Sequence, residues 1–159
     1  MRSLLEAWVR LTKPLVWKFA NAYDLRINKH CLAQGQNPLV IEDFDETKRW
    51  ISKSVFFNTR SGSIHVGRDT LIAEDVMILT GKHYSVGEAE REGKPLHHVP
   101  EQGRDIRIGR HCFIGSGAII IGPVTIGDYA VVGSGSVVTR DVPERCFVAG
   151  VPAKVVSKL

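Results

Sequence analysis

The hydrophobic positions in the second half of the chain recur every six residues. The position after each of them is most often glycine, and the fourth position after each carries a small or β-branched residue in every case. The recurring aliphatic residues are Ile108, Ile114, Ile120, Ile126, Val132 and Val138. Helices repeat about every 3.6 residues and ordinary strands about every 2, so this longer period indicates short strands alternating with corners. The pattern predicts a parallel β-helix in which aliphatic side chains stack from one coil to the next.

The same repeat begins earlier in the chain and in the same phase. Its first steps are Val66-Gly67, Ile72-Ala73 and Ile78-Leu79. Residues 85–105 carry many charges and two prolines but no repeat, so we expect them to leave the coil as an excursion. Loops of this length without secondary structure of their own are usually functional or disordered. The two blocks supply about three coils, and we expect one irregular coil at residues 55–62.

The amino-terminal segment has an apolar stripe at helical spacing with basic residues mostly elsewhere. The stripe consists of Leu4, Leu5, Trp8, Val9, Leu11, Leu15, Phe19 and Tyr23. Pro14 removes a helical hydrogen-bond donor, so two short helices or one kinked helix are expected. This arm is expected to pack on the β-helix or on a neighbouring subunit. The alternative is a basic amphipathic helix on a membrane surface, which the aromatic side chains beside Lys and Arg favour.

These patterns divide the chain into three parts. Residues 1–54 are expected to form an N-terminal helical arm and a connection, and residues 149–159 a C-terminal tail. Residues 55–148 are expected to form the β-helix, with the excursion loop at about 85–105. Within the connection, residues 31–50 are expected to lack the repeat, and Asp45 or Glu46 to begin a short helix through Trp50.

Composition and charge narrow the classes of function. The net charge of +4 comes from the first 30 residues, which hold six Lys or Arg against Glu6 and Asp24. No nucleic-acid motif accompanies this charge, so no nucleic-acid partner is expected. No run approaches the roughly 18 apolar residues of a membrane span, and charges interrupt any secretory signal. A cytoplasmic protein is therefore expected, with peripheral contact at the inner face of the membrane as an alternative. The three cysteines lack metal-ligand spacing, and Cys112 is expected to pack as an apolar residue.

Residues 108–156 resemble the carboxy-terminal half of the hexapeptide-repeat acyltransferases, particularly the galactoside, maltose and polysaccharide O-acetyltransferase branch. The matching sequence is IGRHCFIGSGAIIIGPVTIGDYAVVGSGSVVTRDVPERCFVAGVPAKVV, and residues 58–84 extend it. The resemblance implies an all-β core in the form of a left-handed parallel β-helix. It also implies a homotrimer with active sites between subunits, and acetyl-CoA as co-substrate with no metal.

Acetyl transfer to a hydroxyl needs a base, because a hydroxyl is too weakly acidic to attack a thioester unless its proton is accepted. Histidine suits that task near neutral pH. The segment ILTGKHY is similar to the family segment that carries the catalytic histidine, which makes His83 the candidate base. His97 and His98 in the excursion are rivals. Asn58 resembles the active-site asparagine of the family, and the alternative for it is a turn residue. FIGSG matches the segment that supplies the oxyanion donor, which points to the N–H of Ser116.

The resemblance also implies where CoA binds. Its phosphates call for cations and free backbone N–H groups. The matched positions are Phe113, Ser116, Gly133, Ser134, Arg140, Gly150, Val151 and Lys154.

The leading hypothesis is acetyl transfer from acetyl-CoA to a carbohydrate or glycan hydroxyl, without a covalent enzyme intermediate. The alternative is N-acylation of an amino sugar or nucleotide amino sugar. Two less favoured classes are a carbonic-anhydrase-like metalloenzyme, for which the chain lacks the His-x4-His spacing, and a non-catalytic β-helix scaffold. The identity of the acceptor and the length of the acyl chain stay open at this stage.

Overall fold

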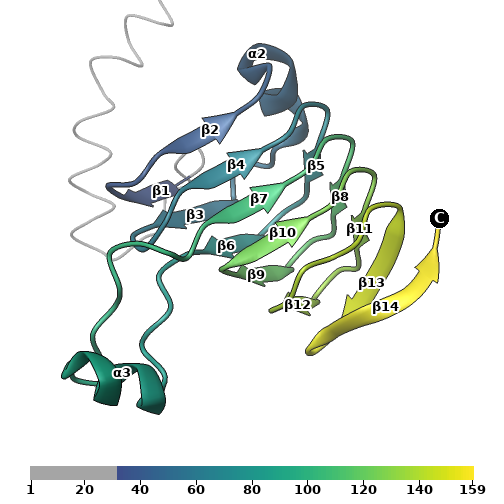
Figure 1. Cartoon of the computed structure of the whole chain (residues 1–159). Helices are drawn as coiled ribbons and strands as arrows, with labels where there is room; N and C mark the ends of the chain where they lie inside the picture. Colours follow the sequence, from purple (N-terminus) through teal and green to yellow (C-terminus); the bar gives the residue numbers. More distant parts are fainter. Residues whose placement is uncertain (1–31) are drawn as a thin grey trace, which may run out of the picture.

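The computed structural model describes residues 32–159, which wind into a left-handed parallel β-helix of three sheets (Figure 1). The predicted fold class is confirmed in this part of the chain, whereas the predicted helical arm at residues 1–31 lies outside it. Sheet A contains β1 (Leu32–Gly35), β3 (Phe56–Thr59), β6 (Met77–Leu79), β9 (Ile119–Ile121) and β12 (Val137–Val138). Sheet B contains β2 (Leu39–Ile41), β4 (Ile64–Val66), β7 (Ile106–Ile108) and β10 (Val124–Ile126). Sheet C contains β5 (Leu71–Ile72), β8 (Phe113–Ile114), β11 (Val131–Val132), β13 (Cys146–Gly150) and β14 (Ala153–Lys158).

The core is the stack of inward aliphatic side chains that the six-residue repeat predicts. In sheet B, Ile108 pairs with Val66 on one side and Ile126 on the other, and all three are at most 2% exposed. Burying one such side chain contributes on the order of 1.5–3 kcal/mol before the entropy of ordering is counted. The small-residue slots are buried as well. Burial raises the pKa of the Cys112 thiol, as its predicted apolar role requires.

The chain passes from sheet to sheet through three corners, each built alike in successive coils. The B–C corner comprises residues 67–70, 109–112 and 127–130, and the C–A corner comprises residues 73–76, 115–118 and 133–136. The A–B corner comprises residues 60–63, 122–123 and 139–141, together with the excursion. Glycine is required where corners stack closely, since a Cβ on Gly109 would lie 2.5 Å from Asp128 Oδ1. Left-handed backbone recurs at equivalent places, for example at His111 (φ 54°) and Tyr129 (φ 59°).

Residues 32–50 contain more regular structure than the repeat suggests. β1 pairs with β3 and β2 pairs with β4, so the coil starts before the first recognisable hexapeptide. Backbone pairing needs no six-residue signature, and this explains why the repeat did not reveal these strands. The predicted short helix is present as α2 (Phe44–Thr47) followed by the 3-10 turn η1 (Lys48–Trp50), beginning at Phe44 rather than at Asp45 or Glu46.

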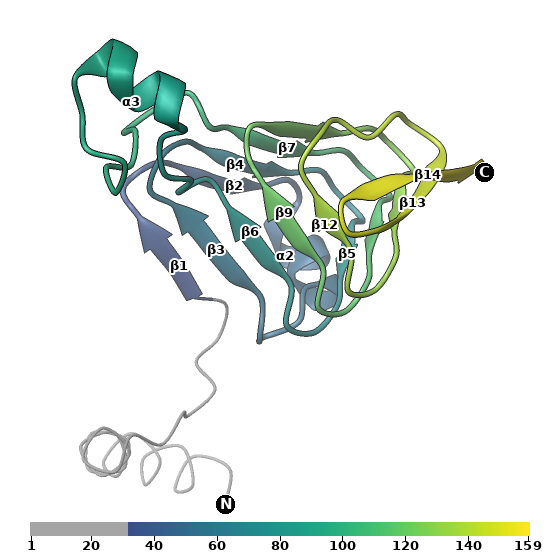
Figure 2. The ribbon, with the colours of Figure 1, turned by 90° about the horizontal axis from the view of Figure 1, so that it is seen from below.

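The excursion leaves sheet A after β6 and returns at β7, as predicted, and it carries a helix of its own. This helix, α3 (Val86–Glu92), projects away from the coils (Figures 1 and 2). Ser85 and Glu88 form a capping box at its start, and Gly93 in left-handed conformation ends it. At the other end of the molecule, β14 runs antiparallel to β13 and closes the open edge of sheet C. None of the helices described in residues 32–159 is long and apolar enough to span a bilayer.

Candidate active site

His83 lies where the excursion departs from sheet A, with its side chain exposed. Its Nδ1 is 2.8 Å from the backbone carbonyl oxygen of His97. A carbonyl oxygen only accepts hydrogen bonds, so Nδ1 carries the proton of the neutral ring. The other ring nitrogen, Nε2, then holds the lone pair and is available to accept a proton.

The two rival histidines, His97 and His98, lie in the part of the excursion that returns to the coils, next to His83 and Tyr84. His97 contributes its carbonyl oxygen rather than its ring. The ring of His98 stacks on Tyr84, with centroids 5.7 Å apart, and the Tyr84 N–H donates to the His98 carbonyl at 3.2 Å. The departing and returning parts of the excursion therefore contact each other directly beside His83.

Asn58 lies at the end of β3, against the first residue of the segment that leads to His83. Its Oδ1 accepts a hydrogen bond from the Arg60 N–H at 2.9 Å, which is the geometry of a turn residue. A Cβ on Gly81 would lie 2.9 Å from that same oxygen, so a larger residue there would require the Asn58 amide to move. A hollow of about 370 Å³ opens beside Asn58, lined in the described chain also by Gln34, Gly35, Gln36 and Arg60.

Ser116 and Ser134 occupy equivalent positions of the C–A corner, in successive coils. The Gly135 N–H donates to the Ser116 carbonyl at 2.9 Å, which ties the two turns together. The Ser116 hydroxyl donates to Glu74 Oε2 at 3.1 Å. Within residues 32–159, the backbone N–H of Ser116 has no hydrogen-bond partner and faces an exposed turn. It is thus free to donate to an oxygen of a ligand.

The other positions matched to CoA lie mainly on sheet C and the same corner. Phe113 points outward from β8 and is 43% exposed. Gly133 is packed close to Ala149 and Phe147, and the Gly150 N–H donates to Ser136 Oγ at 3.2 Å. Val151 and Lys154 are exposed in and beside the turn from β13 to β14. Arg140 differs from the rest because it follows β12 and belongs to the A–B corner.

One chain does not bring the two groups of predicted residues together. β6 starts next to the C–A corner and ends next to the A–B corner, from which the segment carrying His83 departs. Ser116 and Ser134 therefore lie at one edge of sheet A, while Asn58, His83 and Arg140 lie at the opposite edge.

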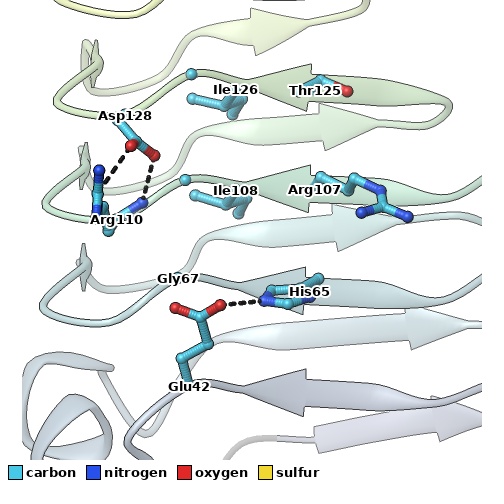
Figure 3. Close-up of a pocket in the computed structure, with 11 residues that line it drawn as sticks. Glu42, His65, Gly67, Arg107, Ile108, Arg110, Thr125, Ile126 and Asp128 are labelled. Carbon is cyan, nitrogen blue, oxygen red and sulfur yellow. Dashed lines mark hydrogen bonds and ion pairs between the residues drawn. The ribbon is translucent and has the colours of Figure 1, made fainter.

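A second hollow, of about 380 Å³, lies on the outer face of sheet B, away from all of these residues (Figure 3). Gly67, Gly109 and Gly127 line it, and no side chains fill the space at these positions of the B–C corner. His65 Nε2 lies 2.9 Å from Glu42 Oε1 there, while Arg110 and Asp128 form a second charged pair (Figure 3). None of the predicted catalytic or CoA-binding residues lines it. In the described chain, no three His, Cys, Asp or Glu side chains are grouped as a metal site requires.

Sequence reasoning did not single out Glu88 and Arg104. Glu88 Oε1 accepts a hydrogen bond from Arg104 Nη2 at 2.7 Å. Hydrogen bonds from the Ser85 backbone and hydroxyl, and then the Arg104 pair, lower the pKa of Glu88 to about 2. Because the folded pKa is lowered, the stabilisation is complete above the usual glutamate value and is lost as the pH falls toward 2. The Ser-x-x-Glu spacing at residues 85–88 is the sequence signal for the helix start.

Known proteins share the repeat and the fold of this chain. Residues 105–140 match the family model described as bacterial transferase hexapeptide (six repeats). The galactoside O-acetyltransferase of Escherichia coli (strain K12) is 29% identical, over 92% of this chain and 77% of that protein. The chain is thus similar to the hexapeptide-repeat acyltransferases, and the family model matches the repeats of residues 105–140.

Solved structures of hexapeptide-repeat acyltransferases share its fold. A maltose O-acetyltransferase from Clostridium difficile 630 superposes with a TM-score of 0.58 at 26% identity, covering 84% of this chain and 68% of that one. A hexapeptide-repeat-containing acetyltransferase from Vibrio cholerae O1 biovar eltor, solved in complex with acetyl coenzyme A, superposes with a TM-score of 0.52 at 25% identity, covering 88% and 77%. The chain spans about half the length of several other curated relatives.

Gly81→Ala tests the packing of Asn58 beside the base. We expect the added methyl group to displace the Asn58 amide and to lower the free energy of unfolding by about 1–3 kcal/mol. The same substitution in an Asn58→Ala background should cost much less, because the clashing amide is gone. Equal costs in the two backgrounds, measured by chemical denaturation, would show that Gly81 and Asn58 are not in contact.

Proposed function

We propose that the protein is an acetyl-CoA-dependent O-acetyltransferase that acts on a hydroxyl of a carbohydrate or glycan. The hydrogen bond from His83 Nδ1 to the His97 carbonyl carries this proposal. It fixes the ring and leaves Nε2 as proton acceptor on an exposed side chain, which is the arrangement that a general base needs.

The proposed reaction is a direct transfer. The acceptor oxygen attacks the carbonyl carbon of the acetyl thioester while its proton passes to His83 Nε2. The negative charge that develops on the carbonyl oxygen is stabilised by the Ser116 N–H. Collapse of this intermediate breaks the carbon–sulfur bond, and the proton on His83 passes to the leaving thiolate. The products are an acetyl ester and CoA, and His83 returns to its neutral form.

The hollow beside Asn58 suits a carbohydrate acceptor. Its described lining consists of two glutamines, an asparagine and an arginine around Gly35, and amide groups both donate and accept hydrogen bonds. Sugar hydroxyls require such paired donors and acceptors. Asn58 lies against Gly81, two residues before His83, so an acceptor in this hollow is close in the chain to the base.

The C–A corner and sheet C suit acetyl-CoA as co-substrate. The unpaired Ser116 N–H is available for the thioester oxygen, and exposed Phe113 offers an apolar surface to the pantetheine arm. Lys154 offers an exposed cation to the phosphates, which bind ammonium and guanidinium groups well. Gly133, Ser134, Gly150 and Val151 lie along the same side, and we assign them to backbone contacts with CoA. The proposed reaction uses no metal.

The outward face of sheet A supports a homotrimer. Sheet B exposes a mixed column containing one aliphatic and three polar side chains: Val40, His65, Arg107 and Thr125. Sheet A exposes an apolar column: Phe56, Met77, Ile119 and Val137. Each of these four is at least partly exposed in the single chain. Large apolar surface of this kind marks interfaces between proteins.

If three copies turn sheet A toward a common axis, the A–B corner of each copy meets the C–A corner of its neighbour. Closed rings with such head-to-tail contacts are the usual form of odd-numbered homo-oligomers. His83, Asn58 and Arg140 of one subunit then face the Ser116 and Ser134 positions of the next. The trimer thus unites the two half-sites that one chain holds apart.

Substitution of His83 tests the proposed base. His83→Ala should lower kcat for acetyl transfer by about 10²- to 10⁴-fold while leaving CoA binding intact, because only proton transfer is lost. His97→Ala is the matched control, since its contribution comes from the backbone carbonyl, and it should stay close to wild type. Acetyl-CoA turnover against sugars, amino sugars, nucleotide sugars and glycolipids would measure both variants and distinguish O- from N-acylation. A fully active His83→Ala protein contradicts the proposal.

Ile119→Arg tests the proposed trimer axis. Three arginines brought together on an apolar axis repel one another, so the assembly should dissociate from three chain masses to one and acetyl transfer should be lost. Thr125→Arg, at an outward position of sheet B, is the control and should leave the assembly and the activity unchanged. Sedimentation velocity measures the mass. A trimeric Ile119→Arg protein would place the interface on another face.

A further inference from the structure

One carboxylate of α3, that of Glu88, binds residues at both the beginning and the end of the excursion. Glu88 Oε2 accepts hydrogen bonds from the Ser85 N–H at 2.8 Å and from the Ser85 hydroxyl at 2.7 Å. The other oxygen, Oε1, accepts from Arg104 Nη2 at 2.7 Å. Ser85 is two residues after His83, and Arg104 is the last residue but one before β7. The Glu88 carboxylate therefore connects the two ends of the excursion through hydrogen bonds.

Arg104, near the end of the excursion, is held against the coils of the β-helix. Its N–H donates to the Ser61 carbonyl at 3.1 Å, and its side chain is only 11% exposed. The backbone carbonyl of Arg104 lies against Gly122 of the next coil, where a Cβ would not fit. A guanidinium held by the coils in this way gives α3 a fixed anchor. The Glu88 side chain is 28% exposed, so the pair is partly shielded from water.

The turn that holds His83 follows directly from α3. The Lys94 N–H donates to the Ala89 carbonyl at 2.9 Å, and the His98 N–H donates to the Pro95 carbonyl at 2.9 Å. These bonds connect the end of α3 to the turn whose His97 carbonyl accepts from His83 Nδ1. Ala89 is the buried residue of α3 itself. A displacement of α3 thus moves the acceptor that orients the imidazole ring.

We infer that Glu88 and Arg104 are positioning residues of the acyl transfer, which hold α3 on the coils and so keep the His97 carbonyl on His83 Nδ1. The inference rests on the proposed function of His83 as base. Neither residue touches a substrate in this scheme. Their loss should permit rotation and tautomer exchange of the His83 ring and so reduce kcat, while the acetyl-CoA surface on the C–A corner stays unchanged.

Glu88→Gln is the first test, because glutamine keeps an oxygen for the Ser85 cap and removes the charge that Arg104 binds. We expect kcat to fall about 10- to 100-fold, the range produced by misplaced catalytic groups, with KM for acetyl-CoA unchanged. Arg104→Met should have the same effect, and the double variant should lose no more than either single variant, since both remove one interaction. Glu92→Gln, at the exposed end of the same helix, is the control and should match the wild type.

The ¹⁵N chemical shifts of the His83 ring report the orientation directly. The wild-type ring should show a protonated Nδ1 and an unprotonated Nε2, and both variants should show a mixture of tautomers. Folded variants with wild-type kcat, or with an unchanged tautomer, would overturn the inference. If His83→Ala is inactive while Glu88→Gln and Arg104→Met are fully active, only the positioning role fails. If His83→Ala stays active, the role of His83 as base fails, and the positioning inference loses its premise.

Discussion

The in-register stacking of inward aliphatic side chains is the constraint on which the rest of this structure depends. Each coil places its aliphatics directly on those of the coil before, as Ile106 does between Ile64 and Val124. A slip of one residue would turn the buried set of a strand outward, so the register is strongly fixed. Every corner is thereby placed at a fixed position in each coil. A functional group that directly follows a strand is therefore positioned by the register of the coils, without further contacts to hold it.

This geometry explains why the proposed site residues fall into two groups. Corners of one type form an edge along the prism, and sheet A separates the C–A edge from the A–B edge. The proposed oxyanion donor and most of the proposed CoA-binding positions fall on the first edge, whereas the proposed base, Asn58 and Arg140 fall on the second. A β-helix cannot fold these edges onto one another, because its coils are rigidly stacked. Association through the apolar face of sheet A is a simple way to join them, and it leaves the more polar face of sheet B toward solvent.

The repeat predicted the coils, the buried positions and the place of the excursion, because stacking leaves a periodic trace in the sequence. β1 and β2 escaped prediction, since their pairing uses backbone hydrogen bonds that any side chains permit. The resemblance to known acyltransferases pointed to His83, but the partner of its ring is a backbone carbonyl, which has no sequence signature. The ion pair of Glu88 and Arg104 spans 16 residues and depends on how the excursion closes. A capping-box spacing was visible in the sequence, whereas the arginine that completes it was not.

The division of the active site between subunits is most directly tested by mixing two inactive variants. His83→Ala removes the base, and Ser134→Trp places a bulky side chain over the stacked Gly115 and Ser116 turn of the C–A corner. If neighbouring subunits each supply one edge, trimers assembled from equal amounts of both should regain about one quarter of the wild-type sites. Acetyl-CoA turnover by the mixed trimers measures this recovery. Complete inactivity of trimers that demonstrably contain both chains would contradict a site shared between subunits.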